Sequence, residues 1–144
     1  MSIWFENYSL EQINQTNENT MVENCGIKIT SLTDNELRGT MPADDRNKQP
    51  FGILHGGANC VLAETLGSIA ANLTCDPTKE HAVGLNISTS HLKPVRNGLV
   101  EGVARPVQLG KKIHVWEIKT FNENSQLTSS TNLTLAIVPK LARK

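Results

Sequence analysis

The sequence predicts an α+β fold in which an antiparallel β-sheet wraps around one long central helix. Three observations predict it. Residues 57–73 form the only long helical pattern, two short strand patterns precede it, and four longer strand patterns follow it. A single helix must bury one face, and a continuous sheet is the surface available to cover it.

The chain before the long helix carries three short elements and a loop. Ser9 and Gln12 have the spacing of a capping box, which predicts a short helix over residues 10–16. Ile27 and Ile29 alternate with polar neighbours, which predicts a strand, and residues 37–42 form a second one. Residues 42–54 contain two prolines and a glycine, so we expect an ordered loop there.

The long helix should be about 25 Å long at 1.5 Å per residue. One stripe of its surface is predicted to face the sheet; it consists of Leu62, Leu66, Ile69 and Leu73. Glu64 lies on the opposite side among small and apolar residues, and Ser68 follows it by one turn. The side that carries the acid is therefore not an ordinary charged surface.

Four strands are predicted after the helix, over residues 82–95, 99–108, 112–121 and 126–139. Asn97-Gly98 is a strong hairpin signal between the first two, and further turns are expected near 109–110 and 122–125. The four strands are thus expected to be linked by consecutive hairpins. In the last strand, one parity holds Leu127, Leu133, Leu135 and Ile137, which predicts a buried face.

Length and composition exclude several classes of protein. A chain of 144 residues fits a single domain over 1–144. Its 14 basic and 14 acidic residues show no long basic run, which argues against a nucleic-acid partner. Three cysteines without C-x-x-C spacing favour reduced thiols and a cytoplasmic location. We expect no membrane association, because no apolar run approaches the roughly 20 residues that span a bilayer and the start lacks a signal-peptide pattern.

Glu64 is the first candidate for chemistry. It is the only charged residue between Gly56 and Leu73, whereas an exposed helical face normally carries several charges. We therefore expect it in a pocket or at an interface, where a carboxylate is a candidate base or nucleophile. The alternative is that Glu64 simply marks the exposed side of an amphipathic helix.

His55-Gly56-Gly57 is the second candidate, because it precedes the first helical turn. Backbone N–H groups there lack intrahelical partners, and the helix dipole is positive. Such groups suit a carbonyl oxygen that becomes an oxyanion. The alternative is that His55 is a loop residue and the two glycines only turn the chain.

Taken together, "KQPFGILHGGANCVLAETLGSIA" (48–70) resembles the signature of the hotdog-fold acyl-CoA thioesterases. The likeness continues through "HLKPV" (91–95) and "LGKKIHVWEI" (109–118), and so covers roughly residues 25–138. The resemblance is strongest to the branch of the dihydroxynaphthoyl-CoA thioesterases and the enterobactin-pathway proofreading thioesterase. It implies the hotdog fold and hydrolysis of acyl-CoA thioesters, with aromatic acyl groups favoured and neither metal nor cofactor required.

The resemblance also implies residue roles. Glu64 matches the nucleophile or general base, and Gly56 matches the glycine whose N–H polarises the thioester carbonyl. Gln49 and His55 match the side chains that position the thioester, and Ser68 matches the hydroxyl that orients the acid or water. The residues that match the CoA-binding positions are Gly84, His91, Leu92, Lys93, Gln108, Gly110, Lys111 and Lys112. Leu92 and Lys93 replace a more common histidine and arginine.

An isolated subunit would expose the small, apolar side around Glu64, and such a face usually marks an interface. A twofold dimer is therefore expected, with the sheets edge to edge and segment 49–56 of one chain against Glu64 of the other. The resemblance implies that two such dimers form a homotetramer.

Other functions remain open at this point. They are a medium-chain aliphatic acyl-CoA thioesterase, a hotdog hydratase or dehydratase, and a non-catalytic acyl-CoA-binding hotdog protein. A metal hydrolase is disfavoured because the four histidines lack ligand spacing.

Overall fold

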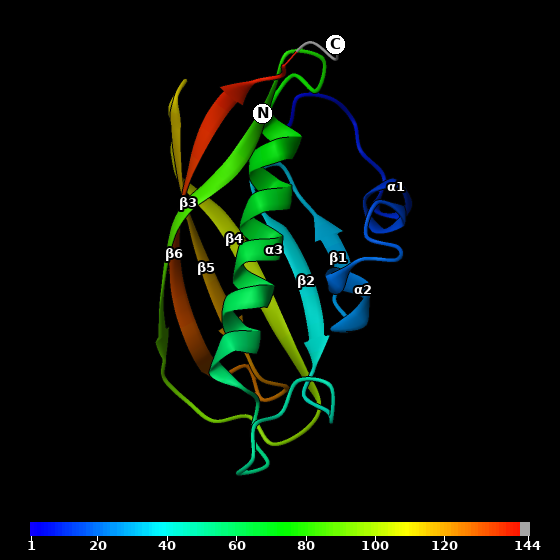
Figure 1. Cartoon of the computed structure of the whole chain (residues 1–144), viewed down its shortest axis with the longest axis vertical. Coiled ribbons are helices and arrows are strands. Elements are labelled where there is room, and N and C mark those ends of the chain that lie inside the picture. Colours follow the sequence, from blue (N-terminus) through cyan, green and yellow to red (C-terminus); the bar gives the residue numbers. More distant parts are fainter. Residues whose placement is uncertain (142–144) are drawn as a thin grey trace.

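The computed structural model describes residues 1–141 and shows a long helix lying across a curved antiparallel sheet (Figure 1). The 19-residue helix α3 (Gly56–Thr74) is the central element. The sheet has six strands in the order β1-β2-β4-β5-β6-β3. Their bounds are β1 Lys28–Leu32, β2 Leu37–Pro42, β3 Glu80–His91, β4 Leu99–Leu109, β5 Ile113–Phe121 and β6 Leu127–Pro139. The predicted α+β class and the long helix are confirmed.

Two short helices precede the sheet. Helix α1 (Leu10–Gln15) begins with the predicted capping box: Gln12 N–H donates to Ser9 Oγ at 3.1 Å, and Ser9 N–H donates to Gln12 Oε1 at 3.0 Å. Helix α2 (Met21–Asn24) was not predicted. Its four residues make one turn, which is too short to show a helical period in the sequence.

Strand β3 pairs with β6 and not with β4, so the prediction of a hairpin at Asn97-Gly98 is wrong. Gly98 does have a left-handed φ of 80°, but its carbonyl accepts from Ala43 N–H at 2.8 Å, next to β2. The turn therefore leads the chain across to β2 instead of back along β3. The β4–β5 and β5–β6 hairpins are confirmed, and β3 is left at the edge of the sheet.

The face of α3 that packs on the sheet differs in part from the predicted stripe. Leu62 and Leu66 are fully buried as expected, but Ile69 and Leu73 are only partly buried and border a hollow beside Tyr8 and Ile13. The rest of the sheet-facing row consists of small residues, namely Ala63, Gly67 and Ala70. A Cβ on Gly67 would meet the Leu133 and Ile118 side chains. The small residues therefore let the helix approach the sheet closely, which sequence parity alone did not reveal.

In β6, Leu133 and Leu135 are fully buried as predicted, whereas Leu127 is exposed. The pairing of β5 with β6 shifts register between Thr120 and Phe121, opposite this part of β6. An irregularity of one residue moves the following side chains to the other face of the sheet. The prediction that alternate residues of β6 are buried from Leu127 onward is therefore wrong for Leu127.

Candidate active site

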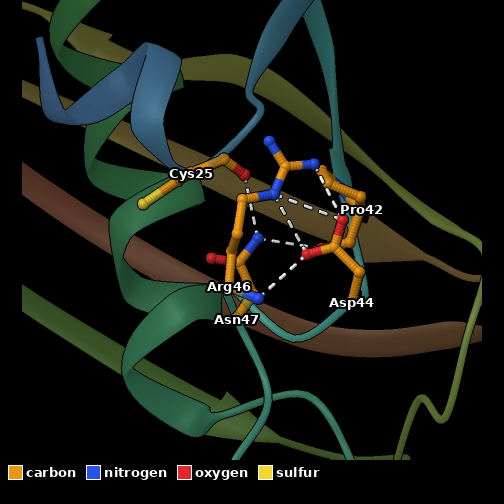
Figure 2. A network of polar contacts seen from close by, with 5 residues as sticks. All are labelled: Cys25, Pro42, Asp44, Arg46 and Asn47. Carbon is orange, nitrogen blue, oxygen red and sulfur yellow. Dashed lines mark hydrogen bonds and ion pairs between the residues drawn. The ribbon is translucent and has the colours of Figure 1, made fainter.

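The loop between β2 and α3 is fixed by Asn47, which is 4% exposed (Figure 2). Its Nδ2 donates to the carbonyl oxygens of Cys25 at 2.8 Å and Pro42 at 2.9 Å. Its own carbonyl accepts from His55 N–H at 2.8 Å. One side chain and its backbone thus connect the segment after α2, the end of β2 and the start of α3. An Asp44–Arg46 ion pair of 2.7 Å lies in the same loop.

The first turn of α3 leaves one backbone donor free. His55 is the N-cap, and its Nδ1 accepts from Gly57 N–H at 2.8 Å. The His55 carbonyl accepts from Ala58 and Asn59 N–H. Gly56 N–H has no acceptor within residues 1–141. The dipole of a 19-residue helix makes this end of α3 positive, so the free N–H is suited to an anionic oxygen.

A hollow lies directly beside this donor and brings together five of the predicted site residues. They are Gln49, Gly56, His91, Leu92 and Lys93. The His91 ring comes within 3.1 Å of a Cβ built on Gly56, so a side chain at this position would crowd the ring. Gln49 Oε1 accepts from Phe51 N–H, and its own N–H donates to Ile53 O at 2.9 Å. The side chain and backbone of Gln49 are therefore both engaged within the loop.

Glu64 lies eight residues further along α3, about 12 Å from Gly56 at 1.5 Å per residue. Ser68 Oγ donates to Glu64 Oε1 at 3.4 Å. A Cβ on Gly84 of β3 would collide with the same carboxylate oxygen. Gly84, predicted to contact CoA, is thus the position that makes room for the acid.

The carboxylate of Glu64 borders a second hollow with an apolar lining. The other residues around it are Met21, Val22, Cys60, Val61, Thr65 and Ile87. The surroundings differ from the solvated side of an amphipathic helix, where other charged residues would be expected. Glu64 is half-buried at the edge of an apolar space, which suits an acid that acts on an apolar substrate.

The remaining predicted residues, 108–112, do not join either hollow. Gly110 N–H donates to Ile113 O at 3.0 Å and closes the turn between β4 and β5, where Lys111 and Lys112 are exposed. Across the sheet the pairings run from Leu109 to His114, then to Leu135 and to Gly84. The turn is thus level with Gly84 and about 23 Å along the strands from His91. Lys93 and the two lysines of the turn are separate in one chain.

Asn59 is a member of the first hollow that the sequence did not single out. Its Nδ2 lies 3.2 Å from His91 Nδ1, and the residue is buried. One asparagine in an apolar helix resembles an ordinary exposed position, so only its spacing of three residues from Gly56 could have indicated it. In residues 1–141, no group of three or more His, Cys, Asp or Glu is placed to hold a metal ion. None of the described helices is long and apolar enough to cross a membrane.

Comparisons with known proteins identify the family of the chain. The model of the thioesterase superfamily matches residues 51–129. The chain is 43% identical over 136 residues to a 1,4-dihydroxy-2-naphthoyl-CoA hydrolase of Escherichia coli, covering 94% of this chain and 99% of that protein. It is 45% identical over 136 residues to the proofreading thioesterase EntH of Cronobacter sakazakii, with 94% and 98% covered.

Solved structures give the same result for the whole chain. A thioesterase from Haemophilus influenzae superposes with a TM-score of 0.94 at 40% identity, covering 98% of both chains. A mutant thioesterase from Pseudomonas aeruginosa superposes with a TM-score of 0.95 at 40% identity, covering 96% of this chain and all of that one.

Proposed function

The chain belongs to the thioesterase superfamily of hotdog-fold enzymes, and on that premise we propose that it hydrolyses acyl-CoA thioesters with aromatic acyl groups. The observation that carries the proposal is the placement of Glu64. Its carboxylate accepts a hydrogen bond from Ser68 and lies against Gly84. Glu64 also borders an apolar hollow that is lined by side chains from α2, α3 and β3. Relatives named for a dihydroxynaphthoyl-CoA substrate support the aromatic acyl class.

The chemistry needs one donor and one acid. Gly56 N–H donates to the thioester oxygen, which becomes negative as the carbonyl carbon is attacked. A donor of this kind contributes about 3 to 4 kcal/mol of transition-state stabilisation. Glu64 either attacks the carbon itself or takes a proton from the water that attacks it. If water attacks, the C–S bond breaks, the thiolate takes the proton that Glu64 removed, and the free acid leaves. If Glu64 attacks, C–S cleavage leaves an acyl–Glu64 anhydride, which water hydrolyses to the free acid while a proton of that water passes to the thiolate.

One chain alone does not bring these two groups to the same carbonyl. Gly56 and Glu64 are about 12 Å apart along α3, and a glutamate side chain reaches only about 4 Å from its Cα. The shared site of a homodimer removes this separation. In it, Gly56 of one chain acts with the partner's Glu64.

A twofold pairing of β3 edges fits the contacts within each chain. Gly56 touches His91, and Glu64 touches Gly84, so pairing that places His91 beside the partner's Gly84 also places Gly56 beside the partner's Glu64. The axis would then pass midway between 56 and 64 on α3, at Cys60, and midway between 84 and 91 on β3, near Ile87. Cys60 and Ile87 line the same hollow, which supports a single axis through both.

The same pairing accounts for the separated lysines. The turn at 108–112 is level with Gly84 in its own chain, so it would come to the end of the sheet where the other chain's His91 and Lys93 lie. CoA is long enough to extend from the thioester between Gly56 and the partner's Glu64 toward that turn. We propose that Leu92, Lys93, Gln108, Gly110, Lys111 and Lys112 hold the CoA portion in this way, in a cytoplasmic enzyme. Two such dimers would form the tetramer.

The test is turnover of an acyl-CoA panel, with CoA release followed by a thiol reagent. We expect benzoyl-CoA and dihydroxynaphthoyl-CoA to react faster than medium-chain acyl-CoA. Glu64→Gln should lower kcat at least about a hundredfold, the scale of losing a general base, while the far-UV spectrum stays unchanged. Retention of more than half the activity by Glu64→Gln would show that the acid has another role. Binding without turnover by the wild type would favour the non-catalytic alternative.

A further inference from the structure

A polar contact in the first hollow is not used by the proposed chemistry. Asn59 Nδ2 lies 3.2 Å from His91 Nδ1, and Asn59 is only 5% exposed. Its Oδ1 is buried and has no hydrogen-bond partner among residues 1–141. An unpaired buried amide oxygen costs free energy that an apolar side chain of the same shape would avoid. The contact with the His91 ring is therefore what the amide contributes.

That contact fixes where the ring carries its proton. In the amide orientation of this structure, Asn59 Nδ2 is the donor and the His91 Nδ1 that it faces is the acceptor. In a neutral imidazole the other nitrogen then carries the hydrogen, which gives an Nε2–H group. Nε2 itself has no hydrogen-bond partner within the described residues. His91 thus presents a free donor on the side of the ring away from Asn59.

The ring lies over Gly56 and borders the hollow. The atoms Nε2, Cε1 and Cδ2 are 3.1, 3.2 and 3.5 Å from a Cβ built on Gly56. Nearly equal distances mean that Gly56 lies over the flat side of the ring and not in line with the Nε2–H bond. The bond lies in the ring plane and therefore points past Gly56, and His91 lines the same hollow as Gln49 and Lys93.

The two donors are close enough to serve one oxygen. Gly56 N is about 2.5 Å from its own Cβ position in standard geometry, so it lies no more than about 5.6 Å from His91 Nε2. Two donors that each lie about 2.9 Å from a shared acceptor can be up to about 5.8 Å apart. The separation between the two donors therefore allows one oxygen to lie within hydrogen-bond distance of both.

We propose that His91 Nε2–H is a second donor to the thioester oxygen, beside Gly56 N–H, and that Asn59 is the positioning residue that fixes its tautomer. The inference rests on the proposed function and changes the role of His91 from holding CoA to stabilising the oxyanion. Both donors strengthen as the oxygen becomes negative, so they act on kcat more than on substrate binding.

The first test compares kcat and KM for benzoyl-CoA and for the pantetheine thioester of benzoic acid, which lacks the nucleotide. His91→Phe should lower kcat about a hundredfold with both substrates. Asn59→Leu should lower it about tenfold with little change in KM. The double variant should be no slower than His91→Phe, because Asn59 acts through the ring. A raised KM for the CoA ester with normal turnover of the pantetheine ester would overturn the proposal.

The second test reads the tautomer without measuring activity. Imidazole ¹⁵N spectra of the wild type should show His91 as Nε2–H, and Asn59→Leu should shift it toward a mixture. The melting temperature of Asn59→Leu should equal or exceed that of the wild type, which a merely structural asparagine would not allow. An Nδ1–H tautomer in the wild type overturns this inference.

The two failures are distinguishable. A wild-type protein that hydrolyses none of the thioesters overturns the proposed function and, with it, the role of His91. A wild type that hydrolyses them while Asn59→Leu and His91→Phe keep full kcat overturns only the role of these two residues.

Discussion

At the scale of single residues, the position of the Glu64 carboxylate depends on the absence of a side chain at Gly84. Ser68 donates to one oxygen of the carboxylate, and Gly84 leaves the space that the same oxygen fills. Gly84 therefore helps to determine where the Glu64 carboxylate lies, although it has no functional group of its own. An added methyl group there would act directly on the direction of the carboxylate.

Gly84→Ala should accordingly lower kcat by about tenfold or more, because a catalytic group displaced by about 1 Å loses much of its effect. Stability should change little, since the added methyl group meets only the end of the flexible Glu64 side chain and the backbone of Gly84 does not need a left-handed φ. Steady-state kinetics with benzoyl-CoA and a thermal melt would measure both. Full activity in Gly84→Ala would mean that the carboxylate can move without loss.

The residues of the site differed in how well the sequence predicted them. Glu64 stood out because it is the only charged residue in an apolar helix, and burial of a lone charge costs desolvation free energy. His55 was predicted to position the thioester, and the structure gives its Nδ1 a capping contact with Gly57 N–H. Asn59 could not be recognised, because its importance depends on His91, 32 residues away, which reaches it only through the path of β3.

At the scale of elements, the loop between β2 and α3 fixes the position of the first turn of the helix. Asn47 binds two carbonyls from different segments through one amide nitrogen and receives His55 N–H on its own carbonyl. The direction of the first turn of α3, and of the free Gly56 N–H, thus depends on a buried side chain outside the hollow.

Asn47→Asp tests the role of the Asn47 hydrogen bonds with almost no change in side-chain shape. A carboxylate cannot donate to the Cys25 and Pro42 carbonyls, so we expect a loss of about 2 kcal/mol in the free energy of unfolding. Activity should fall as well, because the donor at Gly56 would lose its fixed direction. Denaturant melts and kcat for benzoyl-CoA would show this. Asp44→Asn, which weakens only the exposed ion pair with Arg46, should change both much less. Equal effects of the two variants would contradict the role of Asn47.

The elements were predicted well where the signal is local and poorly where it is not. The capping box, the long helix and two hairpins follow from neighbouring residues. The pairing of β3 with β6 does not, because Asn97-Gly98 has the chemistry of a tight turn wherever the chain goes afterwards. Gly67 and the buried alanines determine which side of α3 faces the sheet. The closeness of Gly67 to Leu133 cannot be read from a helical wheel.

At the scale of the whole molecule, the proposed site exists only when two chains associate, and refolding mixtures can test this. Inactive Glu64→Ala and inactive Gln49→Ala/Gly56→Pro chains should, when unfolded and refolded together, regain up to about a quarter of wild-type activity, from random pairing and one intact site in two. Glu64→Ala refolded with Glu64→Gln is the matched control and should regain none. Mixed oligomers without recovery would place each site within a single chain.

The axis proposed at Cys60 gives a second test of the assembly. Cys60 is half-buried and lies midway between Gly56 and Glu64, so the two copies should be near each other in the dimer. Helices in contact are about 8 to 10 Å apart, which a short bismaleimide can span. In a Cys25→Ser background, the reagent should give covalent dimers that disappear in Cys60→Ser. Failure to cross-link a protein that sediments as a dimer would move the axis elsewhere.

The place of β3 at the sheet edge also affects how the chain is made. Among residues 1–141, the only strand that pairs with β3 is β6, which follows it by several dozen residues. At roughly 5 to 20 residues per second, a ribosome needs some seconds to produce that neighbour after β3 has emerged. During this time both edges of β3 are unpaired, and its apolar residues, including Val83 and Leu85, can contact other nascent chains. Strand β3 is therefore the segment where we expect holdase chaperones to bind during translation, and where a slowed ribosome would lead to aggregation.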